Sequence, residues 1–368
     1  MKPVIDEFEK ENPEVKIDLS TNQGDTNSYA QTLSTRAAGN QLPDVFHINE
    51  NGRTLQKAGV LRDLTGEKFL EGVAQPNIDI ETFDGKVYGL APSIWVGGII
   101  VNKDLLKKAG YDEVPDTLDE FIKMCNDLSK MGVTPYMEGT GEISGSFFPM
   151  MGGVNAQNGN SEGNLPILEG KTTFSQAWTS TVKQWLRLVD EGAMPREVVG
   201  MSNDQIKQMF LTGQLAMYRS GPWDFADLTA SGINYDLEGY PAVEGGERYL
   251  GGGAPSAYAI SAKIDGAKLE AARKFLSFLN SEKGLQLTEK YCQEISASTK
   301  YTAKVDEHMQ QAYEDYVVKG KYWWPNWTVK GEVMTKEITA QWQLLIQGKQ
   351  TPEQTTENID KKWDSIKG

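Results

Sequence analysis

One segment of this chain, residues 82–110, constrains its fold more than any other. It reads TFDGKVYGLAPSIWVGGIIVNKDLLKKAG and begins near the tight-turn pair Asp84-Gly85. Residues 90–101 carry no charge, yet they include a proline and two glycines, which a single buried strand rarely tolerates. We therefore predict a strand that leaves one sheet, bends and enters a second sheet, before residues 102–104 open an amphipathic helix.

Length and charge narrow the class of protein. At roughly 150 residues per domain, a chain of 368 residues predicts two domains, each large enough for its own core. The formal net charge is −14, with 51 acidic against 37 basic residues. Such a charge disfavours nucleic acid and anionic membranes, because phosphate binding needs a basic surface. No stretch reaches the ~18 apolar residues of a membrane helix. Since no signal-peptide pattern precedes the first helix, we expect a trimmed mature form.

The two cysteines, Cys125 and Cys292, lie far apart in the sequence. They are either a disulfide or redox pair, or two small thiols without a partner. No C-x-x-C motif and no wider cysteine framework accompany them. We therefore expect two unpaired thiols.

Hydrophobic periodicity predicts alternating helices and strands in the first part of the chain. The pattern predicts helices at residues 4–8, 29–38 and 55–60, and strands at residues 15–19 and 42–48. This alternation predicts an α/β protein with a largely parallel sheet covered on both faces.

Three capping boxes, Thr117–Glu120, Ser202–Gln205 and Thr351–Gln354, predict the starts of helices further along the chain. Residues 139–170 are rich in Gly, Asn and Ser, and we expect a long loop region near a functional surface.

Several short segments, taken in their order and spacing, resemble the extracellular solute-binding proteins of ABC importers. The resemblance is to family 1, the sugar-binding type within the maltose-binding protein superfamily, and it spans essentially the whole chain. The segments that carry it are Leu42-Pro43-Asp44-Val45-Phe46, residues 83–90, 102–110, 215–223 (LAMYRSGPW) and 260–284, and the terminal helix containing TPEQ.

The resemblance implies an α/β, two-lobed periplasmic-binding-protein-like fold of type II, with discontinuous lobes joined by a hinge of crossover segments. The implied limits are 1–93 plus 258–296 for the N-terminal lobe, 99–250 plus 299–368 for the C-terminal lobe, and 94–98, 251–257 and 295–298 for the hinge crossings. Family members begin with a central β-strand before the helix that starts here at Lys2. We expect that strand to be missing from the first lobe's sheet, because the chain was trimmed or its start was misassigned.

Tryptophans are the first candidate ligand-binding residues. The chain has nine, and five of them follow residue 322, with Trp323, Trp324 and Trp327 clustered around a proline. Flat indole rings can stack on the C–H faces of sugars, while polar neighbours orient the hydroxyl groups. The alternative is a hydrophobic plug for the tail. The resemblance favours a ligand role for at least one of the three, since family members place an aromatic residue there.

The strand-like residues 216–218 lead into Gly221-Pro222-Trp223-Asp224, at the kind of strand end where α/β folds bind ligands. The resemblance implies that Trp223 stacks on a sugar, and a core position is the alternative. Asp224 either accepts hydroxyl hydrogen bonds or caps a helix. Trp95, inside the first crossover, either faces the ligand or separates the lobes.

Polar candidates lie in two loops. Asn49, Glu50 and Asn51 follow a buried strand and suit vicinal hydroxyl groups, although an ordinary turn is an equal alternative. Glu142, in the Gly-rich loop, is a further candidate. Trp178 and Trp185, seven residues apart on one helix, are expected in the core.

Catalytic and metal motifs are lacking. The only two histidines, His47 and His308, are too few for a metal cluster or an obvious His-dependent triad. No G-x-S-x-G elbow, complete phosphate loop or Asp-x-Asp calcium loop occurs. We expect no catalytic residue, no metal and no cofactor.

We therefore predict a non-catalytic substrate-binding protein that captures a carbohydrate, in particular an oligosaccharide, in an inter-lobe cleft by hinge closure and delivers it to the permease subunits of an ABC transporter. We expect an extracytoplasmic monomer, either a cell-surface lipoprotein or a periplasmic protein. One alternative is a carbohydrate-acting enzyme that pairs Glu50 with Glu142, or either with Asp224. Another is transport of a phosphodiester, a peptide or a polyamine. An anionic ligand would need a cluster of arginines, and Arg219 and Arg248 alone give that reading thin support.

Overall fold

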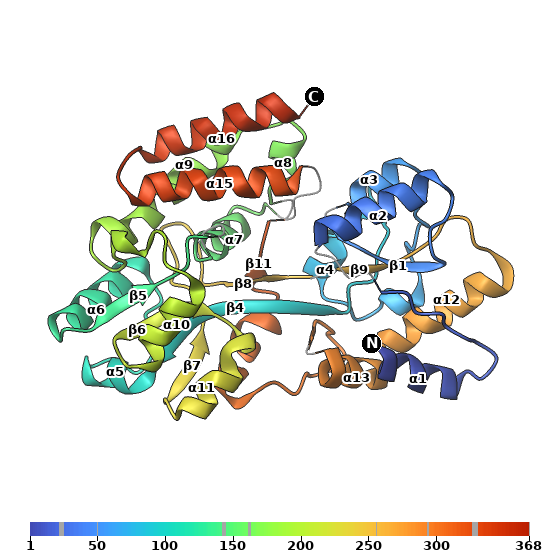
Figure 1. The fold of residues 1–368 in the computed structure, drawn as a ribbon, viewed down its shortest axis with the longest axis horizontal. Helices are drawn as coiled ribbons and strands as arrows, with labels where there is room; N and C mark the ends of the chain where they lie inside the picture. The colour runs from blue at the N-terminus through green and yellow to red at the C-terminus, as the bar shows by residue number, and fades with distance from the viewer. Residues whose placement is uncertain are drawn as a thin grey trace. The chain divides into compact units, whose positions relative to one another are not determined.

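The computed structural model describes residues 1–21, 26–49, 51–141, 145–160, 163–254, 256–292, 294–325 and 330–367. These residues form two compact units, each built from separate stretches of the chain (Figure 1). Unit 1 contains Met1–Trp95 and Gly253–Val305; unit 2 contains Val96–Gly252, Asp306–Pro325 and Lys330–Gly368. The lobe limits predicted from the sequence remain predictions.

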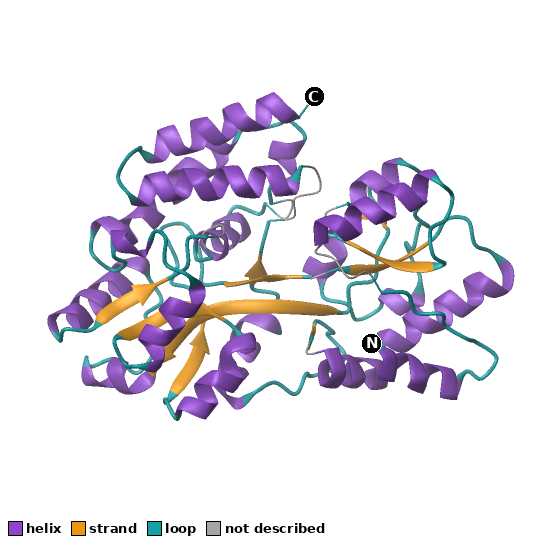
Figure 2. Cartoon of the chain, in the orientation of Figure 1, coloured by secondary structure: helices purple, strands orange, loops and turns teal. Residues whose placement is uncertain are grey.

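Unit 1 is a small sheet surrounded by helices (Figure 2). Its helices are α1 (Lys2–Glu11), α2 (Thr26–Ala38), α3 (Gly52–Lys57), η1 (Lys68–Leu70), α4 (Gln75–Asp79), α12 (Gly266–Leu279) and α13 (Glu282–Cys292). Its strands are β1 (Val45–Ile48), β2 (Thr82–Phe83), β3 (Lys86–Val87), β9 (Ala257–Ile260), β10 (Ile295–Ser296) and the first residues of β4 (Ser93–Asn102).

Two apolar clusters cover the two faces of the β1–β9 sheet. The strands are antiparallel, with Val45 opposite Ile260. Because side chains alternate between the faces, Phe46 joins a cluster with residues of α2 and α3. Ile260 instead joins the cluster formed by α1 and α12. On that second face the rings of Phe8 and Phe275 lie 5.1 Å apart, which ties the first helix to a helix from the second half of the chain.

The predicted strand at residues 15–19 is wrong. Residues 15–20 form no strand in the structure. Val15 and Ile17 still pack against the α1–α12 cluster, and the Ile17 amide donates to the Glu9 carboxylate at 2.7 Å. Leu19 is 45% exposed. The alternating pattern therefore reflects one side of an extended segment that packs on helices instead of pairing with a strand.

Unit 2 is larger. Its helices are α5 (Lys103–Lys108), α6 (Leu118–Lys130), α7 (Phe147–Gln157), α8 (Leu165–Leu168), α9 (Phe174–Asp190), η2 (Arg196–Val198), α10 (Asn203–Leu211), η3 (Pro222–Asp224), α11 (Phe225–Ser231), η4 (Glu307–Met309), α14 (Gln310–Ala312), the π-helix η5 (Tyr313–Val317), α15 (Gly331–Ile346) and α16 (Pro352–Ile366). Its strands are most of β4, with β5 (Thr134–Met137), β6 (Leu215–Ser220), β7 (Tyr235–Glu238), β8 (Leu250–Gly253) and β11 (Tyr322–Trp323).

The sheets are mixed, so the predicted largely parallel sheet is wrong. In unit 2 the strand order is β11-β8-β4-β6-β5, and β7 also pairs with β4. β4 runs antiparallel to β6 and β7, whereas β5–β6 and β8–β11 are parallel. Helix–strand alternation predicts parallel pairing only for strands joined by one short crossover. Here β4 pairs with strands that lie more than 100 residues away in the sequence, such as Ile99 opposite Arg219.

Aromatic side chains fill the core of unit 2. Trp178 and Trp185 are fully buried on α9, as predicted. The ring of Trp342 on α15 lies 5.7 Å from Trp185 and 4.7 Å from Phe147 on α7. The C-terminal helices therefore supply part of this core.

Capping hydrogen bonds define where several helices of unit 2 begin. The predicted boxes at Ser202–Gln205 and Thr351–Gln354 both form, and Thr173–Gln176 is a third that the sequence analysis missed. Asp360 on α16 also accepts the Phe174 amide at 2.7 Å at the first turn of α9. A carboxylate is favourable there because it faces the positive end of the helix dipole.

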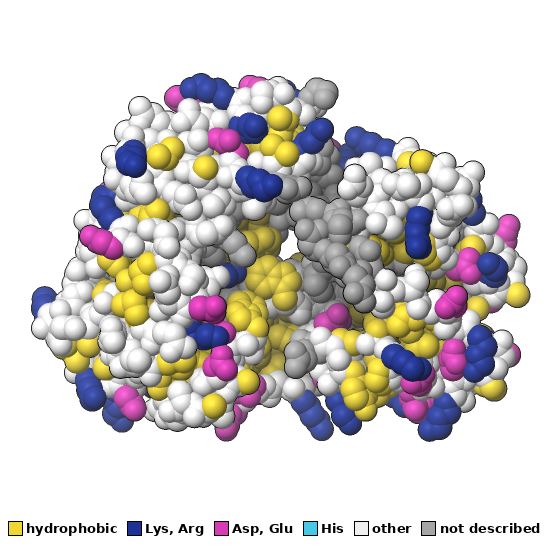
Figure 3. Space-filling view, in the orientation of Figure 1, with side chains coloured by type: hydrophobic (Ala, Val, Ile, Leu, Met, Phe, Trp, Pro, Cys, Tyr) yellow, Lys and Arg dark blue, Asp and Glu magenta, His cyan; other side chains and the backbone are white. Residues whose placement is uncertain are grey.

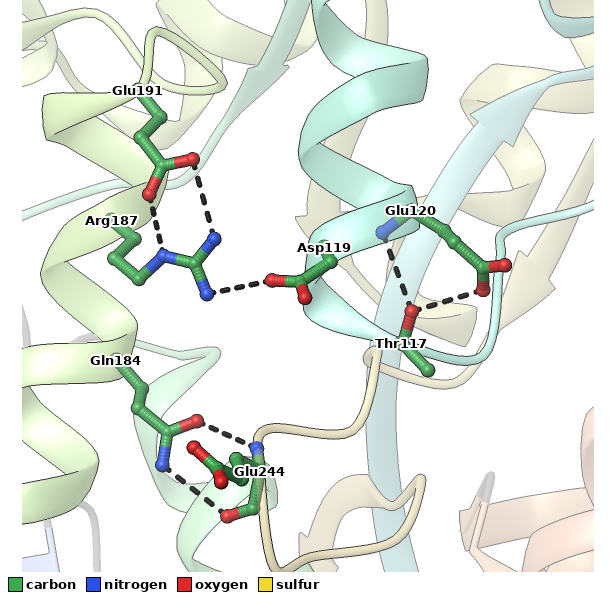
Figure 4. A network of polar contacts seen from close by, with 7 residues as sticks. All are labelled: Thr117, Asp119, Glu120, Gln184, Arg187, Glu191 and Glu244. Carbon is green, nitrogen blue, oxygen red and sulfur yellow. Dashed lines mark hydrogen bonds and ion pairs between the residues drawn. The ribbon is translucent and has the colours of Figure 1, made fainter.

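A polar network joins α9 to its neighbours on the surface of unit 2 (Figure 4). The guanidinium of Arg187 binds Asp119 of α6 at 2.7 Å and Glu191 of its own helix. Gln184 exchanges two hydrogen bonds with the backbone of Glu244, at 2.6 and 3.3 Å. These partly exposed pairs hold a loop against the helix more than they add to stability.

Both cysteines are free, as predicted: Cys125 is buried in unit 2 and Cys292 is half-buried in unit 1. Burial raises the pKa of the Cys125 thiol, which keeps it protonated and unreactive. On the face drawn in Figure 3, basic and acidic side chains are interspersed.

Candidate functional site

Trp223 is a large aromatic side chain that unit 2 leaves on its surface. It lies in the short helix η3, directly after β6, and is 54% exposed. Pro222 opens that helix, where its missing amide hydrogen costs nothing. The backbone therefore turns at the strand end and projects the indole outward.

Two glycines determine where the Trp223 indole lies. A Cβ atom at Gly97 of β4 would lie 3.0 Å from the ring, and one at Gly221 would lie only 2.5 Å from it. The indole therefore rests on bare backbone, and a side chain at either position would displace it. The Arg219 guanidinium lies 5.8 Å from the ring centroid, within cation–π range.

The tail tryptophans lie near the same strands. Trp324 approaches Gly251 of β8, and a Cβ at Gly251 would lie 3.5 Å from the carbonyl oxygen of Gly97. Trp324 also packs edge-on against Phe148, with ring centroids 5.0 Å apart. Trp223 and Trp324 thus lie against neighbouring glycines of β4 and β8. Trp223 is 54% exposed and Trp324 is half-buried, so both rings are partly accessible.

Trp323 is more deeply engaged by the protein. A Cβ at Gly152 would lie 2.6 Å from the Trp323 Cβ, and one at Gly163 would lie 3.0 Å from its ring. Its ring centroid lies 6.0 Å from that of Phe148. These contacts give Trp323 a packing role within unit 2.

Asp224 has three partners within the protein. Its carboxylate accepts from the Tyr218 hydroxyl at 3.0 Å and the Ser220 hydroxyl at 2.5 Å, and forms an ion pair with Lys207 at 3.2 Å. It occupies the N-cap position of α11 but makes no side-chain capping bond. Asp224 therefore ties the η3 turn back to β6 and does not cap α11, and the ligand-binding role predicted for it remains a prediction.

A buried carboxylate holds the ends of the loop that contains Glu142. Glu138 is 1% exposed and accepts from the Tyr136 hydroxyl and from the amide and hydroxyl of Ser146, each at 2.9 Å. Trp185 donates to the same Ser146 hydroxyl at 2.8 Å. Burial, and then the charge of Glu138, raise the pKa of Tyr136, so its phenol stays a donor.

The predicted polar loop in unit 1 lies at the end of β1. The Asn49 amide donates to the Asn51 side chain at 3.3 Å. The Asn49 Oδ1 and Asn51 Nδ2 atoms are buried and have no hydrogen-bond partner among the described residues. Polar atoms in this state favour a hydrogen-bonding ligand, because burying them without partners costs free energy.

His47 precedes this loop on β1. Its ring packs edge-on against Tyr258 at 4.3 Å, and its Nδ1 lies 3.4 Å from the Ser256 hydroxyl. Burial lowers the pKa of His47 to about 4, so the imidazole is neutral at pH 7. It is therefore a packed histidine with no sign of a catalytic or metal-binding role among the described residues.

Glu81 is a buried carboxyl group in unit 1 that the sequence analysis missed. It is 4% exposed, and its Oε2 has no partner among the described residues. A Cβ at Gly89 would lie 3.0 Å from that oxygen. Burial raises the pKa of Glu81 well above its usual value, which favours the protonated form.

Four further candidates were predicted from the sequence. Trp95 is half-buried in the part of β4 that belongs to unit 1. Glu50, Glu142 and Trp327 lie outside the described residues. The site roles predicted for all of these side chains remain predictions.

In the sequence analysis, Arg219 was named only as weak support for an anionic ligand, and Glu138 was missed. Glu138 follows the apolar strand β5 directly, and a carboxylate at that position is a recognisable signal. For Arg219 no local signal exists, because its surroundings come from residues 145, 223 and 240.

The described ranges contain neither a membrane-spanning helix nor a metal-binding cluster. No helix there is both long and apolar enough to cross a membrane. No group of three or more His, Cys, Asp or Glu side chains there is arranged to hold a metal ion.

The fold defines the class of protein. The chain matches the family of bacterial extracellular solute-binding proteins over residues 1–286. It is similar to a solved family 1 extracellular solute-binding protein from Bifidobacterium longum subsp. infantis, with 36% identity, 99% of this chain and 96% of the other covered, and a TM-score of 0.94. The chain therefore belongs to family 1 of the extracellular solute-binding proteins, which are not enzymes. The predicted family and fold class are confirmed.

More distant relatives agree. The chain is 25% identical to the multiple sugar-binding protein of Streptococcus mutans, over 78% of this chain and 69% of that protein. It is 24% identical to the galactooligosaccharide-binding protein of Bacillus subtilis, over 69% and 60%. The match spans 60% of the length of this galactooligosaccharide-binding protein. It spans 54% of the length of a further relative, the maltodextrin-binding protein MdxE of B. subtilis. The apo form of RafE from Streptococcus pneumoniae shares the fold, with 18% identity, 100% and 94% coverage and a TM-score of 0.82.

Proposed function

We propose that this protein is the substrate-binding component of an ABC importer and that it captures an oligosaccharide without altering it. The exposed Trp223 indole, seated on Gly97 and Gly221, carries the proposal. A rigid, half-exposed aromatic face beside polar groups is what sugar rings need, since their C–H faces are apolar and their edges carry hydroxyl groups. The relatives named for sugars support the same ligand class.

The arrangement of Asp224 argues against hydrolysis of the sugar. A glycosidase needs two carboxyl groups that reach the scissile bond. Asp224 instead accepts hydrogen bonds from Tyr218 and Ser220 and pairs with Lys207. A carboxylate engaged in this way stabilises a turn and is poorly placed to act as an acid, a base or a nucleophile.

The finer parts of the proposal come from the sequence and the family. We propose that the ligand is held between two lobes that close about crossings near residues 94–98, 251–257 and 295–298, and that the loaded monomer docks on permease subunits outside the cytoplasm, as a lipoprotein or a periplasmic protein. Small-angle scattering with and without a bound saccharide tests the closure, and light scattering after gel filtration tests the monomer.

The central experiment is isothermal titration calorimetry of the purified chain against di- to tetrasaccharides of different linkage. We expect at least one ligand with a Kd in the micromolar range or below, and chromatography should recover it uncut. Failure of every saccharide to bind would overturn the proposed function, and turnover of any of them would overturn its non-catalytic part.

A further inference from the structure

Arg219 belongs to the same end of β6 but points away from the Asp224 cluster. Side chains of a strand alternate between its two faces. Tyr218 and Ser220 both reach Asp224, so the intervening Arg219 lies on the opposite face. It is half-buried and pairs across the sheet with Ile99 of β4.

Three neighbours hold the Arg219 side chain. A Cβ at Gly145 would lie 2.5 Å from its Nε and 2.8 Å from its Cδ, so the arginine occupies the space that a side chain at 145 would need. Its guanidinium lies 5.8 Å from the Trp223 ring centroid. Its charge also reaches Tyr240: burial raises the pKa of that phenol, and the Arg219 charge opposes the rise.

Arg219 has no carboxylate partner among the described residues, and in this it differs from the other arginines of unit 2. Arg187 pairs with Asp119 and Glu191, and Arg196 pairs with Asp190. Arg248 pairs with Asp116 and Glu238.

The nearby acids have other partners. Asp224 pairs with Lys207 on the opposite face of the strand. Glu138 accepts from Tyr136 and Ser146. The hydroxyl of Tyr240 donates to the carbonyl of Gly98 at 3.1 Å, so it can offer Arg219 only an oxygen lone pair.

A half-buried guanidinium beside an exposed indole favours a particular kind of sugar. Guanidinium binds carboxylate through two parallel charge-assisted hydrogen bonds, which are about twice as strong as neutral ones. Partial burial strengthens the attraction, since the effective dielectric constant is lower than in water. Neutral hydroxyl groups can accept hydrogen bonds from the guanidinium but cannot neutralise its charge.

We propose that Arg219 makes this site selective for an acidic saccharide, one that carries a carboxylate such as a uronic or sialic acid, with Trp223 stacking on the ring and Arg219 binding the carboxylate. This inference rests on the proposed function and adds the substrate class. It assigns to Arg219 the role of a specificity-determining residue.

The test is calorimetry with matched pairs of probes: digalacturonate and its methyl ester, sialyllactose and lactose, and glucuronyl-xylobiose and xylobiose. We expect at least one acidic member to bind tenfold or more tightly than its neutral partner. Its affinity should fall as NaCl rises from 50 to 500 mM, because salt screens a partly exposed ion pair.

Variants separate recognition from folding. Arg219→Gln should weaken binding of the acidic probe tenfold or more and change binding of the neutral partner less than threefold, whereas Arg219→Lys should retain part of the preference. Arg187→Gln removes one guanidinium from the surface network of Figure 4 and should leave the preference unchanged. Circular dichroism melts verify that each variant is folded.

The outcomes are distinct. If neutral saccharides bind as tightly as their acidic partners and Arg219→Gln leaves every affinity unchanged, the inference is overturned while the proposed function stands. If no saccharide of either kind binds the wild-type chain, the proposed function fails and the inference fails with it.

Discussion

Around Asp224, at the end of β6 in unit 2, the polar side chains satisfy one another, whereas at the end of β1 in unit 1 two buried polar atoms have no partner among the described residues. Asp224 has three partners within the protein. In contrast, Asn49 Oδ1 and Asn51 Nδ2 are buried and have no partner among the described residues. The difference indicates that unit 2 presents a preorganised surface, whereas unit 1 contains donors and acceptors that a ligand can satisfy.

This contrast has an energetic side. Each buried polar atom without a partner costs about 1–3 kcal/mol. A rigid aromatic platform loses little entropy when a ligand binds, so the exposed indole can contribute most of its contact energy to affinity. We therefore expect substitutions at the β6 end to change affinity most and substitutions at Glu81 to change stability alone.

The largest effect is expected from Trp223→Ala. Loss of a stacking aromatic should cost about 2–4 kcal/mol of binding free energy, or about 30-fold or more in affinity. The melting temperature should change little, because the ring is 54% exposed. Calorimetry with the saccharide found to bind measures the loss. Tyr291→Ala, which removes a 46% exposed ring from α13, is the matched control and should stay within twofold of wild type. Equal losses in both variants would contradict the comparison.

A smaller effect is expected from Asp224→Ala. The change leaves the partly buried hydroxyl groups of Tyr218 and Ser220 without their acceptor. It should lower the free energy of unfolding by about 1–3 kcal/mol. Affinity should also fall, because the turn that presents Trp223 loses its anchor.

Asp224→Asn is the conservative counterpart. Its amide oxygen can still accept from Tyr218 and Ser220, so only the ion pair with Lys207 is lost, and Lys207 keeps Asp227 at 2.7 Å. Thermal melts should place this variant between wild type and Asp224→Ala. If Asp224→Asn abolishes saccharide binding while the fold is intact, Asp224 contacts the ligand directly.

Glu81→Gln should produce a pH-dependent effect in unit 1. The folded pKa of Glu81 lies well above 4.5, so its contribution to stability is fully present below the unfolded pKa and is lost as pH rises through the folded value. A glutamine does not titrate. The variant should therefore melt about 2 °C or more above wild type at pH 8, with a smaller difference at pH 5.

Calorimetric melts across this range measure the effect. Glu71→Gln, in an exposed pair with Lys300, should show no such trend. If the melting temperatures of wild type and Glu81→Gln depend on pH in the same way, the assignment of a buried neutral carboxyl group is refuted.

The smallest effect is expected from Arg187→Gln. Its partners Asp119 and Glu191 are partly exposed, and such surface pairs contribute about 0–1 kcal/mol. We expect a change in melting temperature of no more than about 2 °C, and raising the salt concentration should reduce even that difference. A larger loss would show that the loop of Glu244 depends on α9 for its position.

Much of the fold was predictable because its signals are local. The capping boxes at Ser202 and Thr351 depend on residues three apart, and the core positions of Trp178 and Trp185 depend on helical spacing. The strand at residues 15–19 and the direction of the sheet were predicted wrongly, since both depend on partners distant in the sequence. Val15 and Ile17 pack on helices of unit 1 instead of pairing with a strand.

The candidate site divides in the same way. The Gly-Pro-Trp turn and the family resemblance made Trp223 a candidate, and the structure shows that its ring is exposed. The Lys207 partner of Asp224 lies 17 residues away, and the neighbours of Arg219 include residues 145 and 240, which no local motif around Arg219 encodes.

The exposure of Trp223 makes the protein its own optical probe. Trp178, Trp185, Trp342 and Trp363 are all buried, so a small collisional quencher such as acrylamide will extinguish the emission of Trp223 before theirs. A bound sugar that covers the indole will protect it from the quencher. Occupancy can then be measured by intrinsic fluorescence without a dye. If no saccharide changes the quenching of Trp223, no ligand covers its ring.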